Sequence, residues 1–174
     1  MARNAKLSHI APSGAARMVD VGPKTASRRH AIAEAWVTVG AGVAAQLRRR
    51  GGLAKGNVFQ AARLAGIMAA KQTANLIPLC HPLPLDWIAV EVRLDGRRVH
   101  IRAEVATEGK TGVEMEAMTA ASVAALTVYD MVKSAGKGIE IGPVRLLEKE
   151  GGKSGRWSRA KAPGRTQEDP GAES

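Results

Sequence analysis

The sequence predicts an α+β fold in which helices pack on one face of an antiparallel sheet. Patterns typical of strands and helices follow one another in the order strand–helix–helix–strand–strand–helix–strand, which suggests this layout. An Asp95-Gly96 pair between two of the strand patterns is a good hairpin turn. With 174 residues, 45% of them apolar, the chain is long enough to form one domain with its own core.

The first half of the chain contains two expected strands and two expected helices. Residues 18–21 have the pattern of a short strand. Residues 29–39 alternate with a period near two and also predict a strand, although their alanines would tolerate a helix. Residues 40–50 fit a short helix. The next helix begins at Asn57, a suitable N-cap, and Pro78 ends it.

The second half contains three expected strands and one long helix. The strands cover residues 87–94 and 97–106, on either side of the hairpin turn, and residues 139–147. Between them, residues 113–134 form an apolar pattern that is typical of a helix.

Composition divides the chain into three parts. Residues 1–17 are polar and basic and are expected to be mobile. Residues 18–150 are expected to form the catalytic α+β domain. Residues 151–174 are rich in Gly, Pro, Ser and charge, and predict a polar flexible tail.

The charge balance favours an anionic partner. The chain has 26 Lys plus Arg against 16 Asp plus Glu, a net charge of +10, which suits nucleic acid, an anionic membrane surface or an anionic small molecule. Aromatic residues make up only 3% of the chain, so few side chains could stack on the bases of a single-stranded nucleic acid. No run approaches the roughly 20 apolar residues of a membrane span. A single cysteine, Cys80, and the absence of a signal-peptide pattern predict a cytoplasmic protein.

Two loops carry candidate functional residues. Cys80 and His81 lie between Pro78 and Pro82, so this segment is expected to be extended and stiff. No further ligands stand at metal spacing, so we expect no metal here, and His81 suits proton transfer or a phosphate contact. Lys55 precedes a helix N-terminus, where it could hold an anion, although it could equally be an ordinary solvated lysine.

The long helix carries charged residues at both of its ends. Asp130 and Lys133 are three residues apart on one face, where they end an apolar stripe. They form either a surface ion pair or a functional pair with tuned proton affinity. Glu114 and Glu116 open the helix, and complementarity to the helix dipole would be enough to explain them.

Several longer strings match a known family in order and spacing, and the chain resembles the MoaC family over about residues 6–156. The matching strings are Met18-Val19-Asp20-Val21, Lys55-Gly56-Asn57-Val58-Phe59, residues 76–83, residues 109–116, Tyr129-Asp130-Met131 with Lys133, and residues 141–147. Such long strings are far more specific than spaced glycines. Asn57 stands where the family often has Asp, and Ala74-Asn75 replace a Trp-Asp pair of some relatives.

The resemblance implies a ferredoxin-like α+β subunit in a homohexamer, a trimer of dimers with sites at a subunit interface. The implied enzyme is a phosphorus–oxygen lyase of molybdenum cofactor biosynthesis. It would convert a cyclised GTP derivative, a nucleotide triphosphate, to a pterin with a cyclic phosphate. We expect no cofactor, no metal, no nucleic acid and no membrane partner. The implied catalytic residues are Asp130, Lys133, Lys55 and His81. The expected substrate-binding residues are Leu79, Cys80, His81, Met115, Glu116, Glu114, Lys71, Arg29, Lys24 and Asp20.

Two other functions remain open on the sequence. A nucleic-acid-binding module is supported only by charge, and a structural partner in a cofactor-assembly complex would need neither Asp130 nor Lys133. The helix raises a further question, because Glu116 and Asp130 are 14 residues apart, or roughly 21 Å along the axis. Either two chains share one site, or residues 114–116 fold back instead of joining the helix.

Overall fold

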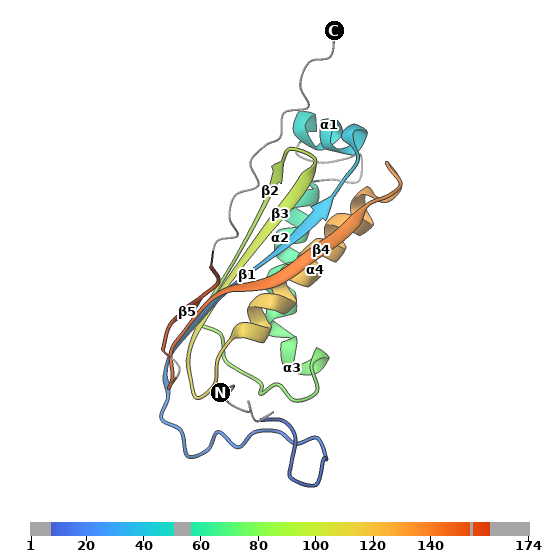
Figure 1. The fold of residues 1–174 in the computed structure, drawn as a ribbon. Helices are drawn as coiled ribbons and strands as arrows, with labels where there is room; N and C mark the ends of the chain where they lie inside the picture. The colour runs from blue at the N-terminus through green and yellow to red at the C-terminus, as the bar shows by residue number, and fades with distance from the viewer. Residues whose placement is uncertain (1–7, 51–56, 154, 161–174) are drawn as a thin grey trace.

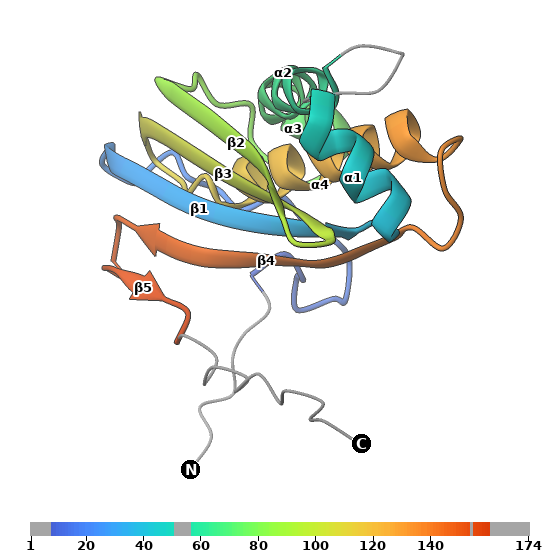
Figure 2. The same ribbon diagram turned by 90° about the horizontal axis from the view of Figure 1, so that it is seen from above.

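The computed structural model describes residues 8–50, 57–153 and 155–160, and it confirms the α+β fold class. Five strands form one antiparallel sheet in the order β2-β3-β1-β4-β5. Figures 1 and 2 show the helices on one face of this sheet, an arrangement compatible with a ferredoxin-like subunit. The strands are β1 Ser27–Thr38, β2 Trp87–Asp95, β3 Arg98–Gly109, β4 Glu140–Glu150 and β5 Trp157–Ser158. The helices are α1 Ala41–Arg50, α2 Val58–Lys71, α3 Thr73–Leu76 and α4 Glu114–Val132.

The core lies between the sheet and helices α2 and α4. Alternate residues of a strand point to the same face, so one face of β1 and β3 supplies the floor of the core with Ala31, Ala33, Ala35, Val37, Val99, Ile101, Ala103 and Val105. Helix α4 packs on this floor through Ala117, Ala120, Ala121, Ala124, Ala125 and Val128, which are fully buried. Because these side chains are small, α4 lies close to the sheet along its whole length.

The strongest turn and cap signals are confirmed. The predicted hairpin between β2 and β3 is confirmed, but its two-residue turn is Gly96-Arg97, because Asp95 ends β2 and pairs with Arg98. Gly96 has a φ of +59°, which glycine adopts without strain. The side chain of Asn57 accepts hydrogen bonds from the backbone amides of Phe59 and Gln60 at 3.1 and 3.2 Å. Asn57 therefore caps α2 as well as an Asp at this position would.

Two predicted elements differ from the structure. Residues 18–21 do not form a strand; the described N-terminal segment instead has a single bridge between Ile10 and Ala16. The helix expected to continue to Pro78 is divided into α2 and α3. The break lies at Gln72, whose φ of −108° and ψ of 8° depart from helical values. The hydroxyl of the next residue, Thr73, donates to the carbonyls of Ala69 and Ala70 at this point.

The sheet extends into the segment predicted as a polar tail. Strand β4 continues to Glu150, and Trp157–Ser158 of β5 pairs with Glu148 and Lys149. Among the described residues, no helix has the length and apolar character needed to cross a membrane.

The contact between α2 and α4 gives a test of the packing. A Cβ atom on Gly66 would lie 2.9 Å from the Ala120 carbonyl oxygen and 3.3 Å from the Ala124 Cβ. We therefore expect Gly66→Ala to lower the free energy of unfolding by about 1–3 kcal/mol, despite a gain of up to about 1 kcal/mol in helix propensity. Urea denaturation measures the change. Gly42→Ala in α1 meets nothing within 4 Å and should not destabilise; equal behaviour of the two variants would contradict the close packing.

Candidate active site

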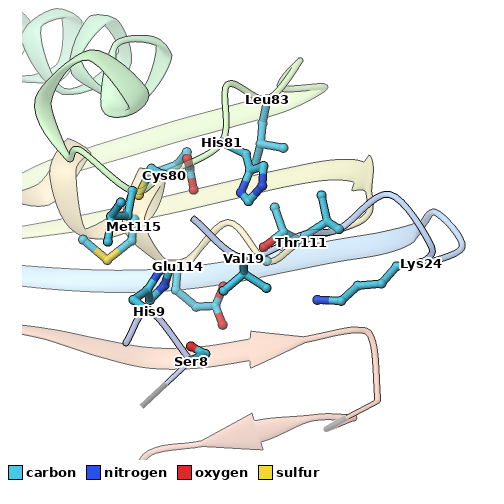
Figure 3. Close-up of a pocket in the computed structure, with 14 residues that line it drawn as sticks. Ser8, His9, Val19, Lys24, Cys80, His81, Leu83, Thr111, Glu114 and Met115 are labelled. Atoms are coloured by element: carbon cyan, nitrogen blue, oxygen red, sulfur yellow. The ribbon is translucent and has the colours of Figure 1, made fainter. Parts of the chain in front are cut away.

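A pocket of about 390 Å³ lies between the N-terminal segment, the loop after α3 and the start of α4. Figure 3 shows His81, Glu114 and Lys24 pointing toward one space from these three parts of the chain. The lining residues are Ser8, His9, Val19, Val21, Lys24, Leu79, Cys80, His81, Leu83, Thr111, Gly112, Glu114, Met115 and Glu116. Segments far apart in the sequence therefore build a single concave site.

The loop that carries Cys80 and His81, which was predicted to be extended, begins with a turn at residues 77–80 and continues without forming a strand. It is fixed at both ends. The Cys80 amide donates to the Ile77 carbonyl at 3.0 Å, and the Thr107 hydroxyl at the end of β3 donates to the Pro84 carbonyl. Burial raises the pKa of the Cys80 thiol, and the nearby Glu116 raises it further. Cys80 is therefore a neutral thiol at physiological pH, a poor nucleophile but a good apolar wall.

Glu116 is the most deeply buried acid of the pocket, with only 4% of its surface exposed. Burial raises the pKa of its carboxyl, and the charge of Glu114 raises it further. Glu114 itself accepts a hydrogen bond from Lys149 Nζ on β4 at 3.0 Å. One of these two neighbouring carboxyls is thus paired with a cation, while burial makes the other easier to protonate, as suits a proton donor.

A second pocket of about 960 Å³ adjoins the first and shares Lys24, Thr111, Gly112 and Glu114 with it. Its basic side chains come from the segment before β1, from β1 itself, and from the ends of β3 and β4: Lys24, Arg29, Lys110, Lys149 and Lys153. Two of these cations also bond to main-chain oxygens, since Arg29 donates to Gly109 and Lys110 donates to Gly22. Fixed cations in a concave surface attract a polyanion such as a phosphate chain.

The structure brings most of the predicted substrate-binding residues together. Lys24, Leu79, Cys80, His81, Glu114, Met115 and Glu116 line the first pocket, and Arg29 lines the second. Asp20 and Lys71 line neither of them. The exposed Asp20 side chain accepts from the Gly22 amide at 2.8 Å, and Lys71 is exposed at the end of α2. Lys55 lies outside the described residues.

Asp130 and Lys133 lie at the other end of α4. Their side chains form an ion pair at 2.6 Å and are 70% and 56% exposed, and the hydrogen bond to Asp130 raises the pKa of Lys133. Neither residue lines the two pockets. Because α4 is continuous from Glu114 to Val132, the alternative in which residues 114–116 fold back out of the helix is wrong. The two groups of candidate residues are therefore held roughly 21 Å apart along one helix.

Some lining residues were missed by sequence reasoning. Thr111 and Lys110 belong to the 109–116 string, so the string itself could have identified them. His9 and Ser8 fall in a segment predicted to be mobile, and Lys149 alternates with acids on β4; neither pattern carries a signal for a pocket. Their positions follow only from how distant segments meet in three dimensions.

The fold and the pockets define an α+β protein whose site combines clustered cations with a buried carboxylic acid, an arrangement that suits an anionic small molecule. The MoaC family model matches residues 18–152, and the chain belongs to the MoaC family. Cyclic pyranopterin monophosphate synthase of Brucella ovis is 53% identical over 155 residues, which cover 88% of this chain and 93% of that protein. The protein of the same name from Bordetella avium is 56% identical over 153 residues, covering 87% of this chain and 94% of its own length. The protein of this name from Bordetella pertussis is 54% identical over 159 residues, which cover 90% of this chain and 98% of that protein.

The buried acid gives a prediction about stability and pH. Because burial raises the pKa of Glu116, the folded protein keeps this proton at pH values at which the unfolded chain has already lost it. This pH range lies between the pKa of Glu116 in the unfolded state and its pKa in the folded state. The protonated carboxyl makes its full contribution to the free energy of unfolding below the unfolded-state pKa. This contribution is lost as the pH rises through the folded-state pKa. Glu116→Gln should therefore raise the free energy of unfolding above that of the wild type near neutral pH. The gain should become smaller as the pH is lowered.

Chemical denaturation at several values between about pH 4 and pH 8 measures this gain. Glu91→Gln, which replaces an exposed carboxylate on β2, is the matched control and should show little change. A gain for Glu116→Gln that grows toward acid, or that is absent at neutral pH, would contradict the effect of burial.

Proposed function

We propose that this chain converts (8S)-3′,8-cyclo-7,8-dihydroguanosine 5′-triphosphate to cyclic pyranopterin monophosphate and diphosphate, a step of molybdenum cofactor biosynthesis. The proposal rests on one observation: relatives with this synthase name match 87–90% of the chain at 53–56% identity, and the region matched by the family model, residues 18–152, supplies most of the pocket. The reaction breaks a phosphorus–oxygen bond and releases diphosphate as the cyclic phosphate closes, so the enzyme is a lyase. We place it in the cytoplasm.

The phosphate part of the reaction needs positive charge. A sugar hydroxyl attacks the first phosphate, a new phosphorus–oxygen bond closes the cyclic phosphate, and diphosphate leaves. Negative charge increases on the phosphate oxygens during this step, and preorganised cations stabilise it. Lys24, Arg29 and Lys110 are suited to this role because they line the two connected pockets. Asp20 and Lys71 complete the expected substrate contacts.

The ring rearrangement needs several proton transfers. His81 and Glu116 line the same pocket, and the raised pKa of Glu116 makes its carboxyl easier to protonate. Leu79, Cys80 and Met115 provide apolar contacts for the purine-derived ring. Lys55, Asp130 and Lys133 complete the catalytic set implied by the family strings, together with His81.

The separation along α4 requires a second chain at each site. We propose that the pocket of one subunit receives Asp130 and Lys133 from another, within a homohexamer built as a trimer of dimers. The exposed apolar side chains of α2 and α4 support an assembly, since Leu64, Met68 and Leu126 are 57–60% exposed. Leu64 and Met68 are four residues apart and so lie on one face of α2, and exposed apolar surface of this kind is typical of interfaces. An isologous dimer would contain two equivalent sites.

Loss of either charged residue at the end of α4 should abolish turnover without unfolding the chain. We expect Asp130→Asn and Lys133→Ala to lower the rate by at least about a hundredfold, the effect usual for an acid–base group. Both side chains are exposed in the subunit, so thermal stability should be nearly unchanged. The assay supplies the cyclised nucleotide and measures diphosphate and the pterin. Arg97→Ala, an exposed cation in the β2–β3 turn, is the control. A near-normal rate in either site variant would contradict the assignment.

Mixing two inactive variants tests whether the site is shared. Asp130→Asn subunits mixed with Glu116→Ala subunits should regain up to about half the activity per site, because some mixed dimers contain one site with both residues intact. The controls are each variant alone, which should stay inactive, and labelled subunits that report exchange. When exchange occurs and activity does not return, each site is built within one chain.

A further inference from the structure

The sheet face that points away from the helices carries a cluster of metal-ligating side chains at one end of β1 and β4. His30 on β1 pairs with Glu150 on β4, and Ile32 pairs with Glu148, so the three side chains share one face. One nitrogen of His30 and one carboxylate oxygen of each glutamate lie within 4.8 Å of one another. We propose that His30, Glu148 and Glu150 bind a divalent first-row transition metal ion, with Zn²⁺ as the representative.

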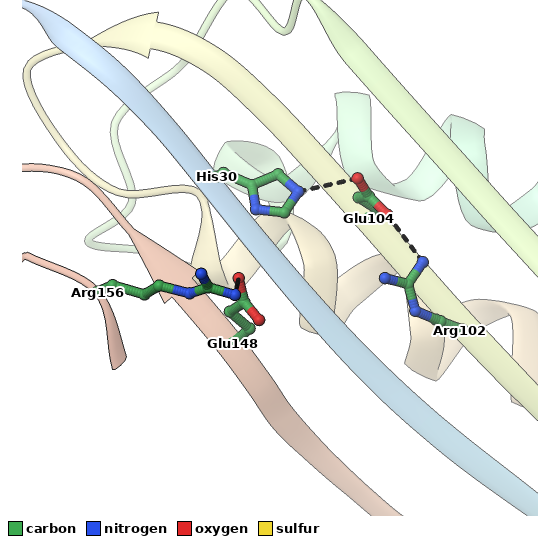
Figure 4. Close-up of polar contacts among 5 residues, drawn as sticks. All are labelled: His30, Arg102, Glu104, Glu148 and Arg156. Carbon is green, nitrogen blue, oxygen red and sulfur yellow. Dashed lines mark hydrogen bonds and ion pairs between the residues drawn. The ribbon is translucent and has the colours of Figure 1, made fainter. Parts of the chain in front are cut away.

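His30 is held in the orientation that a metal ligand needs. Its Nε2 lies 2.9 Å from Glu104 Oε1, and the other oxygen of Glu104 accepts from Arg102 Nη1 at 2.8 Å. An ionised carboxylate accepts only, so Nε2 is the nitrogen that donates to Glu104, and in the neutral imidazole the lone pair is then on Nδ1. Figure 4 shows the second ring nitrogen turned away from Glu104, toward the side where Glu148 lies. Histidine ligands of metals almost always donate their other N–H to such a carboxylate.

A cation already lies against the two glutamates. Arg156 Nη2 is 3.0 Å from Glu148 Oε1, and Glu150 is close enough to interact with the same guanidinium. The Arg156 side chain is 67% exposed, and exposed ion pairs contribute little free energy. A metal dication can therefore displace Arg156, and two carboxylates neutralise its charge.

The geometry restricts the class of ion. Zinc bonds of about 2.0–2.1 Å in a tetrahedron place ligand atoms about 3.3 Å apart, so the three atoms must approach by up to about 1.5 Å. Glutamate side chains can do this by rotation about their side-chain bonds, with water as the fourth ligand. One imidazole with two carboxylates suits Zn²⁺ or Co²⁺ better than Mg²⁺ or Ca²⁺, which prefer oxygen ligands alone.

This site differs from the Cys80-His81 pair considered in the sequence. His30 and Glu148 do not line the pocket around Cys80, although Glu150 lines the adjoining basic pocket. The proposal is independent of the enzymatic reaction, because its ligands bind the ion without substrate and can be tested by binding alone.

The experiment is calorimetric titration of the untagged full chain with Zn²⁺. We expect one ion per chain for the wild type, and loss of this binding in His30→Gln and in Glu150→Gln. Glu104→Ala should weaken the affinity by about 10- to 100-fold, because it releases the imidazole without removing a ligand. Arg156→Ala should tighten binding, since it removes the competing cation. Glu140→Gln, an exposed carboxylate at the opposite end of β4, is the matched control and should bind as the wild type does.

Co²⁺ distinguishes this site from the thiol. A visible spectrum with ligand-field bands and no thiolate charge-transfer band supports the nitrogen–oxygen site, whereas a thiolate band would place the ion at Cys80 and overturn the proposal. It is also overturned when the wild type binds no Zn²⁺, when Glu150→Gln retains full affinity, or when Arg156→Ala leaves the affinity unchanged. If His30→Gln does not fold, Glu150→Gln is the decisive variant, because the Glu150 side chain is exposed and does not contribute to the core.

Discussion

The close packing of α4 on the sheet is the constraint on which the rest of the structure depends. The helix approaches β1 and β3 through alanines that are fully buried, and α2 approaches α4 at Gly66, where even a methyl group would contact the Ala120 carbonyl. Small side chains on both sides allow this short distance. As a result, α4 cannot bend or shift without losing contacts along several turns, and its two ends are fixed relative to the sheet.

This rigidity determines how the site is divided. The first turn of α4 places Glu114 and Glu116 next to the loop of Cys80 and His81, while the last turn places Asp130 and Lys133 far from that pocket. A flexible helix could bring both ends toward one small molecule, but a buried and continuous one cannot. The same packing that stabilises the subunit therefore makes a single chain insufficient for a site that needs both groups, which is why we propose that subunits share it.

The elements with local chemical causes could be predicted from the sequence. Asn57 caps its helix through its own side chain, and the hairpin after Asp95 turns the chain through the positive φ of Gly96. By contrast, residues 18–21 have a strand pattern but do not form a strand, because a strand needs a neighbour with which to pair. The division of the helix lies at Gln72, whose backbone leaves helical values, although glutamine is a good helix former and carries no signal for a break.

For the site, family strings identified residues but not their arrangement. The burial of Glu116, and hence its raised pKa, depends on segments that are distant in sequence. Strand β4 illustrates the same limit: Lys149 reaches Glu114 beside the pocket, while its neighbours Glu148 and Glu150 lie near His30. A run of alternating charges normally indicates a solvated strand. Here the pleat separates the two signs onto different faces, so that one strand contributes a cation to an anion-binding pocket and two carboxylates to a proposed metal site. That separation requires only the period of two that every strand has.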